Sequence, residues 1–347
     1  MACCKSIRSA WNTRTSLIDL SKANDAHGRA AMALQASEAM RTHGFFYVVN
    51  HGYTPEQMAR MFDIADVPFS GVSSEEKHTY TARMKDTGSY QGYKPRQYWH
   101  INNRVHDQLE HYNINRDVTK REHPEAVRPL LGEIEAFARH KHFNVLHLVL
   151  RLLALGLELP EDVLVDLHGF SSVGETYGYY PRTQDEELKT ENVWLKGHTD
   201  FGTITVLYSQ SVAALQILGR DGTWKWIKHM ENALVINAGD ALEFLSGGYY
   251  KATIHRVVQP PVDQQNHTRL GLFYFCMTDD AVKLAPLSES PVLQRARIIR
   301  RVEEVDAPTM EAWRKGRTSA YGQSALKATS EGMEEEVING VVVKHYN

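Results

Sequence analysis

The pattern of apolar and polar positions changes along the chain. Over residues 128–159, apolar side chains recur every three or four positions until Gly156 and Pro160, which predicts a long helix. Residues 172–280 instead hold short β-rich runs separated by turn residues, which predict a sandwich or barrel of short strands. These strands are expected at residues 174–180, 203–208, 215–218, 224–227, 234–237, 241–245, 252–258 and 269–276. From residue 289 the composition again favours helices.

The chain before residue 125 mixes strands and helices. Residues 16–20 and 45–50 predict short strands, with a helix between them over residues 25–42. Thr54 followed by Pro55 predicts the start of another helix. Residues 84–118 are rich in Tyr, His, Asn and Gln and show little periodicity. They form either a polar connection with aromatic anchors or a lid that walls a pocket.

Four regions follow from these patterns, and we expect them to form one unit. They are an N-terminal α/β portion (1–125) with the lid-like segment 84–118, a scaffold helix region (126–171), a β core (172–280) and a C-terminal helical extension (281–347). A chain of 347 residues is long enough to bury a large core without disulfide or metal staples.

Charge and cysteine content exclude several classes of protein. The 39 Lys and Arg against 42 Asp and Glu leave a net charge of −3, so no basic surface suggests a nucleic-acid partner. Cys3, Cys4 and Cys276 are too few for a disulfide framework and fit a reducing, cytoplasmic location. The longest apolar stretch, residues 145–159, is too short and too often interrupted to span a membrane. The 17 histidines are an excess that directs attention to metal sites.

The segment His198-Thr199-Asp200 carries the first candidate chemistry. On a strand, residues two apart point to the same face, which would place an imidazole beside a carboxylate. His255 follows in a second alternating run. Two His and one carboxylate on one face of a metal leave the other face open, as in non-haem Fe(II) oxygenases. Such a spacing also occurs by chance in a chain with many histidines.

Arg269 heads an apolar strand further along. A buried Arg is costly unless an anion pairs with it, and its guanidinium suits a carboxylate. Arg269 is therefore placed to hold the carboxylate of a cosubstrate. The alternative is a strand-end residue that reaches solvent.

Together these residues resemble a known family over nearly the whole chain: the isopenicillin N synthase-like branch of the Fe(II)/2-oxoglutarate-dependent dioxygenases. The resemblance rests on Ile18-Asp19-Leu20, His43-Gly44-Phe45-Phe46 with Asn50-His51-Gly52, Tyr179-Tyr180-Pro181, and the ordered set His198, Asp200, His255 and Arg269. It implies a mainly β fold with flanking α, a distorted double-stranded β-helix (jelly roll) core with helical N- and C-terminal portions.

The resemblance also implies roles for individual residues. His198, Asp200 and His255 would be the iron ligands, and Arg269 with Tyr180 would hold 2-oxoglutarate. Two positions depart from the family pattern: Gly271 stands where Ser is usual, and Gly178 where Asn is usual. Each lost hydrogen bond to the cosubstrate is worth about 1 kcal/mol.

The activity implied by the resemblance is oxidation of a small organic molecule with Fe(II), 2-oxoglutarate and O2. Hydroxylation is the default, desaturation or ring rearrangement is a variant, and secondary-metabolite biosynthesis is the expected setting. Three alternatives stay open: an isopenicillin N synthase-like Fe(II) oxidase that does not use 2-oxoglutarate, a zinc hydrolase with the same ligands, and a jelly-roll sensor without chemistry.

Strand alternation and the lid segment also suggest which side chains line the substrate pocket. The candidates are Tyr98, His100, Tyr112, Thr176, Phe275 and Met277. Packing in the core is the competing interpretation for the aromatic ones. The expected partner is a small-molecule substrate, with no nucleic acid or membrane, and the sequence does not indicate an oligomeric state.

Overall fold

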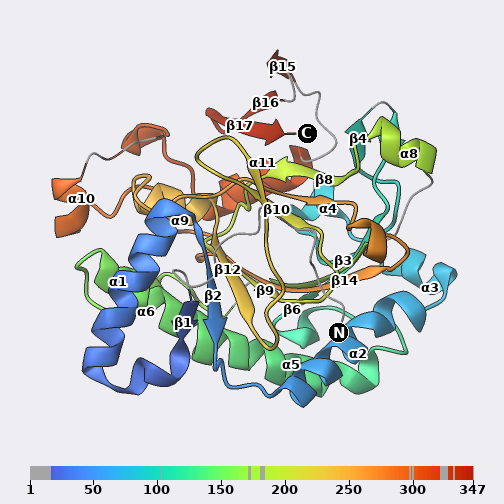
Figure 1. The fold of residues 1–347 in the computed structure, drawn as a ribbon, viewed down its shortest axis with the longest axis horizontal. Helices are drawn as coiled ribbons and strands as arrows, with labels where there is room; N and C mark the ends of the chain where they lie inside the picture. Colours follow the sequence, from blue (N-terminus) through green and yellow to red (C-terminus); the bar gives the residue numbers. More distant parts are fainter. Residues whose placement is uncertain are drawn as a thin grey trace.

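Two β-sheets face each other at the centre of the molecule, and helices cover the outer face of the larger sheet (Figure 1). The structure is a computed structural model and describes residues 17–102, 104–170, 173–179, 184–296, 298, 301–320, 327–330 and 333–346. None of the helices in these ranges is long and apolar enough to cross a membrane.

The larger sheet, within the described residues, has eight strands. Across the sheet these are β1 (Leu17–Asp19), β2 (Phe45–Val49), β12 (Leu234–Ala238), β9 (Ile204–Tyr208), β14 (Arg269–Cys276), β7 (Val173–Tyr179), β6 (Leu109–Asn115) and β3 (Gly92–Lys94). The β1–β2 pair is parallel, and the other pairs are antiparallel.

The smaller sheet is antiparallel throughout. Its strands in spatial order are β11 (Trp224–Trp226), β10 (Leu215–Leu218), β13 (His255–Val258), β8 (Val193–His198), β17 (Val341–Tyr346), β16 (Met333–Ile338) and β15 (Lys327–Ser330). A separate hairpin joins β4 (His100–Asn102) to β5 (Val105–His106). Both large sheets draw strands from distant parts of the chain, and the predicted jelly-roll core is confirmed.

Most helices begin at capping residues or follow the apolar periodicity that the sequence shows. They are α1 (Ala26–Thr42), α2 (Pro55–Ser70), α3 (Ser74–Thr79), α4 (Met84–Thr87), α5 (Leu131–His140), α6 (His147–Gly156), α7 (Val163–Asp166), α8 (Gln184–Lys189), α9 (Asp240–Leu245), α10 (Pro291–Arg295) and α11 (Met310–Ala320). The predicted long helix is α5 and α6 joined by a π-helical stretch, Lys141–Leu146. Thr54 caps α2 through a reciprocal pair of hydrogen bonds with Gln57.

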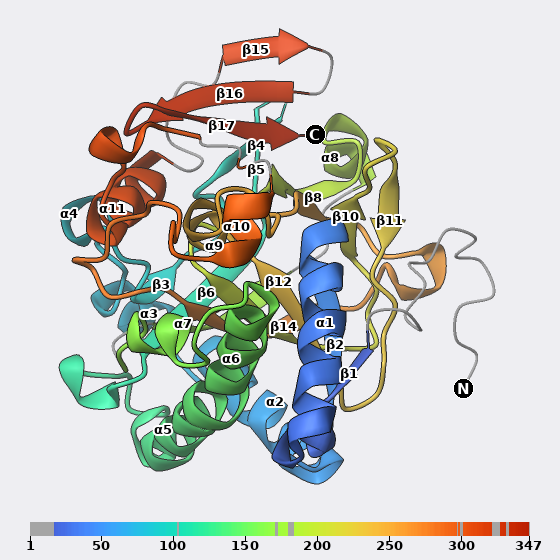
Figure 2. The ribbon, with the colours of Figure 1, turned by 90° about the vertical axis from the view of Figure 1, so that its left-hand side faces the viewer.

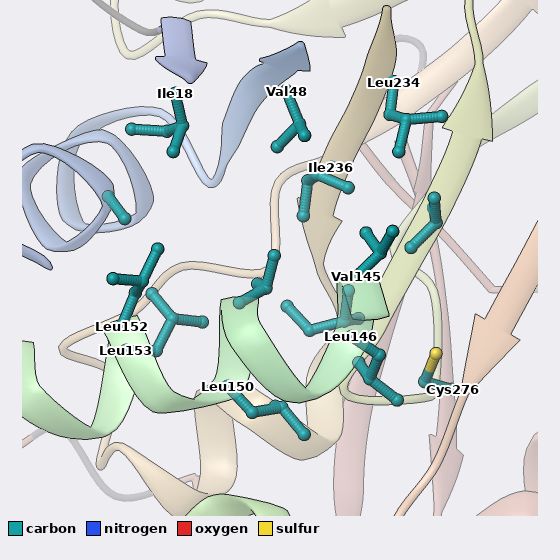
Figure 3. Close-up of a cluster of buried hydrophobic side chains, with 14 of the residues drawn as sticks. Ile18, Val48, Val145, Leu146, Leu150, Leu152, Leu153, Leu234, Ile236 and Cys276 are labelled. Carbon is teal, nitrogen blue, oxygen red and sulfur yellow. The ribbon is translucent and has the colours of Figure 1, made fainter. Parts of the chain in front are cut away.

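The main core lies between the larger sheet and the helices α1 and α6, which lie side by side in Figure 2. Figure 3 shows Leu150 and Leu153 of α6 among side chains that include Val48, Ile236 and Cys276 from the sheet. This packing covers one face of the larger sheet with helices, and the opposite face lines the cavity described below.

Two expectations about secondary structure are wrong. Residues 241–245, predicted as a strand, form the helix α9, because a short apolar run fits either element and Gly239 turns the chain after β12. The extension 281–347 is not helical throughout, since it ends in the strands β15–β17. Asn339 and Gly340, both at positive φ (49° and 78°), form the tight turn between β16 and β17, and Asn-Gly between apolar runs is a hairpin signal.

Leu153 gives a direct test of the helix–sheet core. Its side chain is 0% exposed, so Leu153→Ala should lower the free energy of unfolding by about 2–5 kcal/mol. Leu34→Ala on α1 is the matched control, because Leu34 is 73% exposed and should lose at most about 0.5 kcal/mol. Urea unfolding of both variants measures the difference. Equal losses would contradict this account of the core.

Candidate active site

His198, Asp200 and His255 converge at one end of the smaller sheet. His198 ends β8 and His255 begins β13, and the two residues are direct partners in the antiparallel pairing. Oδ1 of Asp200 lies 3.8 Å from Nε2 of His198 and 3.6 Å from Nε2 of His255. One ligand atom from each residue lies within 4.8 Å of the others. The three residues that the sequence selects therefore face a common point.

Backbone carbonyls orient the two imidazoles. Nδ1 of His198 lies 2.7 Å from the carbonyl oxygen of Lys196, and Nδ1 of His255 lies 3.1 Å from that of Thr253. A carbonyl only accepts, so each Nδ1 carries the proton and each Nε2 offers a lone pair to the centre. Burial, together with the nearby His255, lowers the pKa of His198 to about 3, which keeps this ring in the neutral form that binds a metal.

Two polar residues of the larger sheet orient the carboxylate. Thr205 Oγ1 and Asn237 Nδ2 donate to Oδ2 of Asp200 at 2.6 and 2.7 Å, which turns Oδ1 toward the histidines. Burial alone raises the pKa of Asp200, but His255, His198 and these hydrogen bonds outweigh it and lower the pKa below its ordinary value. The sequence analysis missed both residues. They are direct partners across β9 and β12, and each is a polar residue in an otherwise apolar strand.

The helix α11 supports the turn between His198 and Asp200. Arg317 donates from Nη2 to the carbonyl oxygen of Thr199 at 2.8 Å, and its Nη1 pairs with the buried Asp240. The N–H of Asp240 donates in turn to the carbonyl oxygen of Asp200 at 2.7 Å. No local signal in the sequence pointed to Arg317, because its partners are distant in the chain.

A cavity opens above the three residues, with about 980 Å³ of space including its mouth. Arg269 lines it and is 3% exposed, with its Nε donating to the carbonyl oxygen of Val212 at 3.2 Å. Phe275 and Met277, expected on the face of Arg269, also line the cavity. A Cβ at Gly271 would lie 2.5 Å from the ring of Phe273, so this ring fills the place of the usual Ser.

Other expected pocket residues lie elsewhere. Tyr112 points to the opposite face of the larger sheet, where its hydroxyl lies 2.7 Å from Nδ1 of His123. Tyr98 packs beside the cavity wall without being part of its lining, and its N–H donates to Asp107. His100 is exposed on β4 with its ring against His106.

Two more predicted site residues are Thr176, on β7, and Tyr180, which follows β7 in the sequence. The backbone of Thr176 pairs with Leu272 of β14 and Tyr112 of β6. Tyr180 lies outside the described residues.

An aromatic wall of the cavity is formed by Tyr90 and Trp99 from the segment 84–118 and by Phe201, which follows Asp200. These residues take the place of the predicted lid residues.

The arrangement fits a divalent iron. Two imidazoles and one carboxylate, each oriented by a hydrogen bond to a neighbouring residue, direct their candidate ligand atoms to one point. The open side faces the cavity, and this is the arrangement that Fe(II) oxygenases use to bind cosubstrate and O2. The buried guanidinium of Arg269 in the same cavity suits a carboxylate.

Two family profiles match separate parts of the chain. Residues 173–278 match the 2OG-Fe(II) oxygenase superfamily profile, and residues 16–133 match the profile "non-haem dioxygenase in morphine synthesis N-terminal". The Arabidopsis thaliana protein DMR6-LIKE OXYGENASE 1 is 30% identical over 286 residues, covering 77% of this chain and 74% of that protein. Flavanone 3-dioxygenase 2 of Oryza sativa subsp. japonica is 27% identical over 292 residues, covering 82% and 81%.

Among solved structures, a full-length Neurospora crassa protein in complex with alpha-KG has a TM-score of 0.77 at 22% identity, covering 90% of this chain and 99% of that one. The chain belongs to the 2OG-Fe(II) oxygenase superfamily. It is an Fe(II)- and 2-oxoglutarate-dependent dioxygenase, as its motifs predict.

Thr205→Val tests the anchoring of the carboxylate. The change keeps the shape of the side chain but removes the donor to Oδ2, so Asp200 is held less firmly. Iron affinity should fall by roughly 10- to 100-fold, as for other residues that orient a metal ligand. Competition with a fluorescent chelator measures the affinity, and Thr79→Val at an exposed position is the control. Unchanged affinity would mean that Asn237 alone suffices.

Proposed function

We propose that His198, Asp200 and His255 hold the iron and that Arg269, with Tyr180, holds the distal carboxylate of 2-oxoglutarate. The observation that carries the proposal is that three oriented ligand atoms and a buried guanidinium face the same cavity. A buried cation beside an apolar wall gains most from an anionic partner. The charge of Arg269 therefore contributes the main attraction for the cosubstrate at this end of the cavity.

When bound, the iron supplies O2 activation coupled to oxidative decarboxylation of 2-oxoglutarate to succinate and CO2. The chain supplies orientation. His198 and His255 keep their protons on Nδ1, and Thr205 and Asn237 keep Oδ1 of Asp200 directed at the metal position. Apolar side chains over the site keep bulk water away from it. Hydroxylation of the substrate is the proposed outcome, with desaturation or ring rearrangement as variants on the same site.

The substrate class follows from the wall of the cavity. Tyr90, Trp99 and Phe201 lie close together, with the ring centroid of Tyr90 6.1 Å from that of Trp99 and 6.2 Å from that of Phe201. Aromatic faces and edges of this kind favour a flat, largely apolar molecule. The relative named flavanone 3-dioxygenase supports an aromatic substrate of secondary metabolism. A cytoplasmic location fits the buried thiol of Cys276, which forms no disulfide within the described residues.

Anaerobic titration of the iron-loaded protein with 2-oxoglutarate tests the assignment. The metal-to-ligand charge-transfer band should appear in the wild type and be absent in Asp200→Ala, which removes a ligand. Arg269→Gln should weaken 2-oxoglutarate binding by roughly 10-fold or more, because a charged hydrogen bond is worth about 1.5–3 kcal/mol. Arg60→Gln, at an exposed ion pair, is the matched control.

Two results would contradict the proposal. Full iron binding by Asp200→Ala would remove the metal assignment. Normal 2-oxoglutarate affinity in Arg269→Gln would place the cosubstrate carboxylate elsewhere.

A further inference from the structure

A second cavity lies on the other side of the larger sheet, under the helices α2 and α5. It encloses about 550 Å³ of space including its open side. Nearly all of its wall is apolar, and the side chains come from α2, α5 and the strands β6 and β14, among them Met61, Ile64, Ala65, Phe137 and Leu272. One charged side chain, Arg116, interrupts this apolar wall.

Arg116 is the unusual member of this wall. It follows β6, it is 1% exposed, and Nη1 of its guanidinium contacts Nδ1 of His142. Nε and Nη2 are buried without a hydrogen-bond partner in the described part of the chain. A buried guanidinium with two unmatched donors is expensive, since its lost hydration is not replaced.

No described residue neutralises this charge by contact. Burial, together with the charge of Arg116, lowers the pKa of His142 to about 3, so His142 is a neutral acceptor. Asp279 acts on Arg116 only through space, and its Oδ1 accepts the N–H of Gly169 at 3.0 Å. Arg116 also lies over the ring of Tyr274, 5.1 Å from its centroid, which holds the guanidinium plane in place.

Nε and Nη2, the two atoms of Arg116 without a partner, form the edge of a guanidinium that can donate two parallel hydrogen bonds to one carboxylate. Elsewhere in this chain, Arg60 uses Nε and Nη2 to bind the two carboxylate oxygens of Glu133, at 3.0 and 2.7 Å. Arg314 binds Asp280 through the same edge, at 3.3 and 3.0 Å. Arg116 presents this edge with no protein carboxylate on it in the described residues. Parallel N–H donors of this kind match the planar geometry of a carboxylate.

We propose that this second cavity is a binding site for a small apolar monocarboxylate. The carboxylate binds the Nε and Nη2 edge of Arg116, and the hydrocarbon part packs among Met61, Ile64, Phe137 and Leu272. One guanidinium matches one carboxylate in charge, whereas a phosphate dianion would keep an unpaired charge in an apolar wall. Phe273 lines both this cavity and the active-site cavity, so the two cavities are adjacent. Each would bind its own ligand.

Calorimetric titration of the iron-loaded 347-residue protein with benzoate tests the proposal. The protein is held anaerobically with saturating 2-oxoglutarate, so that the active-site arginine is already engaged. We expect benzoate to bind under these conditions and benzyl alcohol, which lacks the charge, to bind at least about 10-fold more weakly. Failure of benzoate to bind, or its displacement by 2-oxoglutarate, would overturn the proposal.

Two variants locate the site. Arg116→Gln removes the charge and should weaken benzoate binding by roughly 10- to 100-fold. Ala65→Leu keeps Arg116 and fills the cavity, so it should weaken binding even if Arg116→Gln does not fold. Arg41→Gln, at an exposed ion pair within α1, is the control for loss of an arginine and should leave the affinity unchanged. Benzoate affinity that survives in Ala65→Leu would contradict the assignment.

Discussion

The site depends on the hydrogen bonds that hold Oδ2 of Asp200. Asp200 follows β8 of the smaller sheet, whereas its two donors, Thr205 and Asn237, belong to adjacent strands of the larger sheet. The carboxylate therefore joins the two halves of the jelly roll at the point where the histidines meet it. Any change in the spacing of the sheets would rotate Oδ1 away from the two imidazoles. The helical layer behind the larger sheet matters to the chemistry for this reason, because it fixes the position of the donors.

The sequence was sufficient to predict which side chains meet at the site where a motif and strand alternation determine the direction of the side chain. His198 and Asp200 are two apart, His255 pairs directly with His198, and Arg269 shares a face with Phe275. For Tyr112, the prediction was wrong, because this residue does not line the active-site cavity. Both faces of β6 carry large polar or aromatic side chains, so alternation alone does not tell which face meets the cavity. The pairing of β6 with β7 and β3 decides it, and that pairing is a property of the folded sheet.

Sequence patterns could not predict the roles of residues whose partners are distant in the chain. Arg317 looks like one more charge on an amphipathic helix, and Asp240 begins a segment that is apolar enough to be taken for a strand. In the fold, their ion pair is buried beneath the turn that carries Thr199. The helix α9 forms because Asp240 starts it against that turn, and a strand there would remove the backbone hydrogen bond from Asp240 to Asp200.

The glycine at position 271 changes the cavity wall beside Arg269 by more than the loss of a hydroxyl group. With no side chain there, the ring of Phe273 occupies the space and stacks against Phe275, with centroids 5.5 Å apart and planes 17° from parallel. The wall next to Arg269 is therefore aromatic, with less hydrogen bonding and a lower local polarity. A lower polarity strengthens the attraction between a guanidinium and a carboxylate. The proposed binding of 2-oxoglutarate by Arg269 would therefore depend more on the charge of this residue than it would with a serine at position 271.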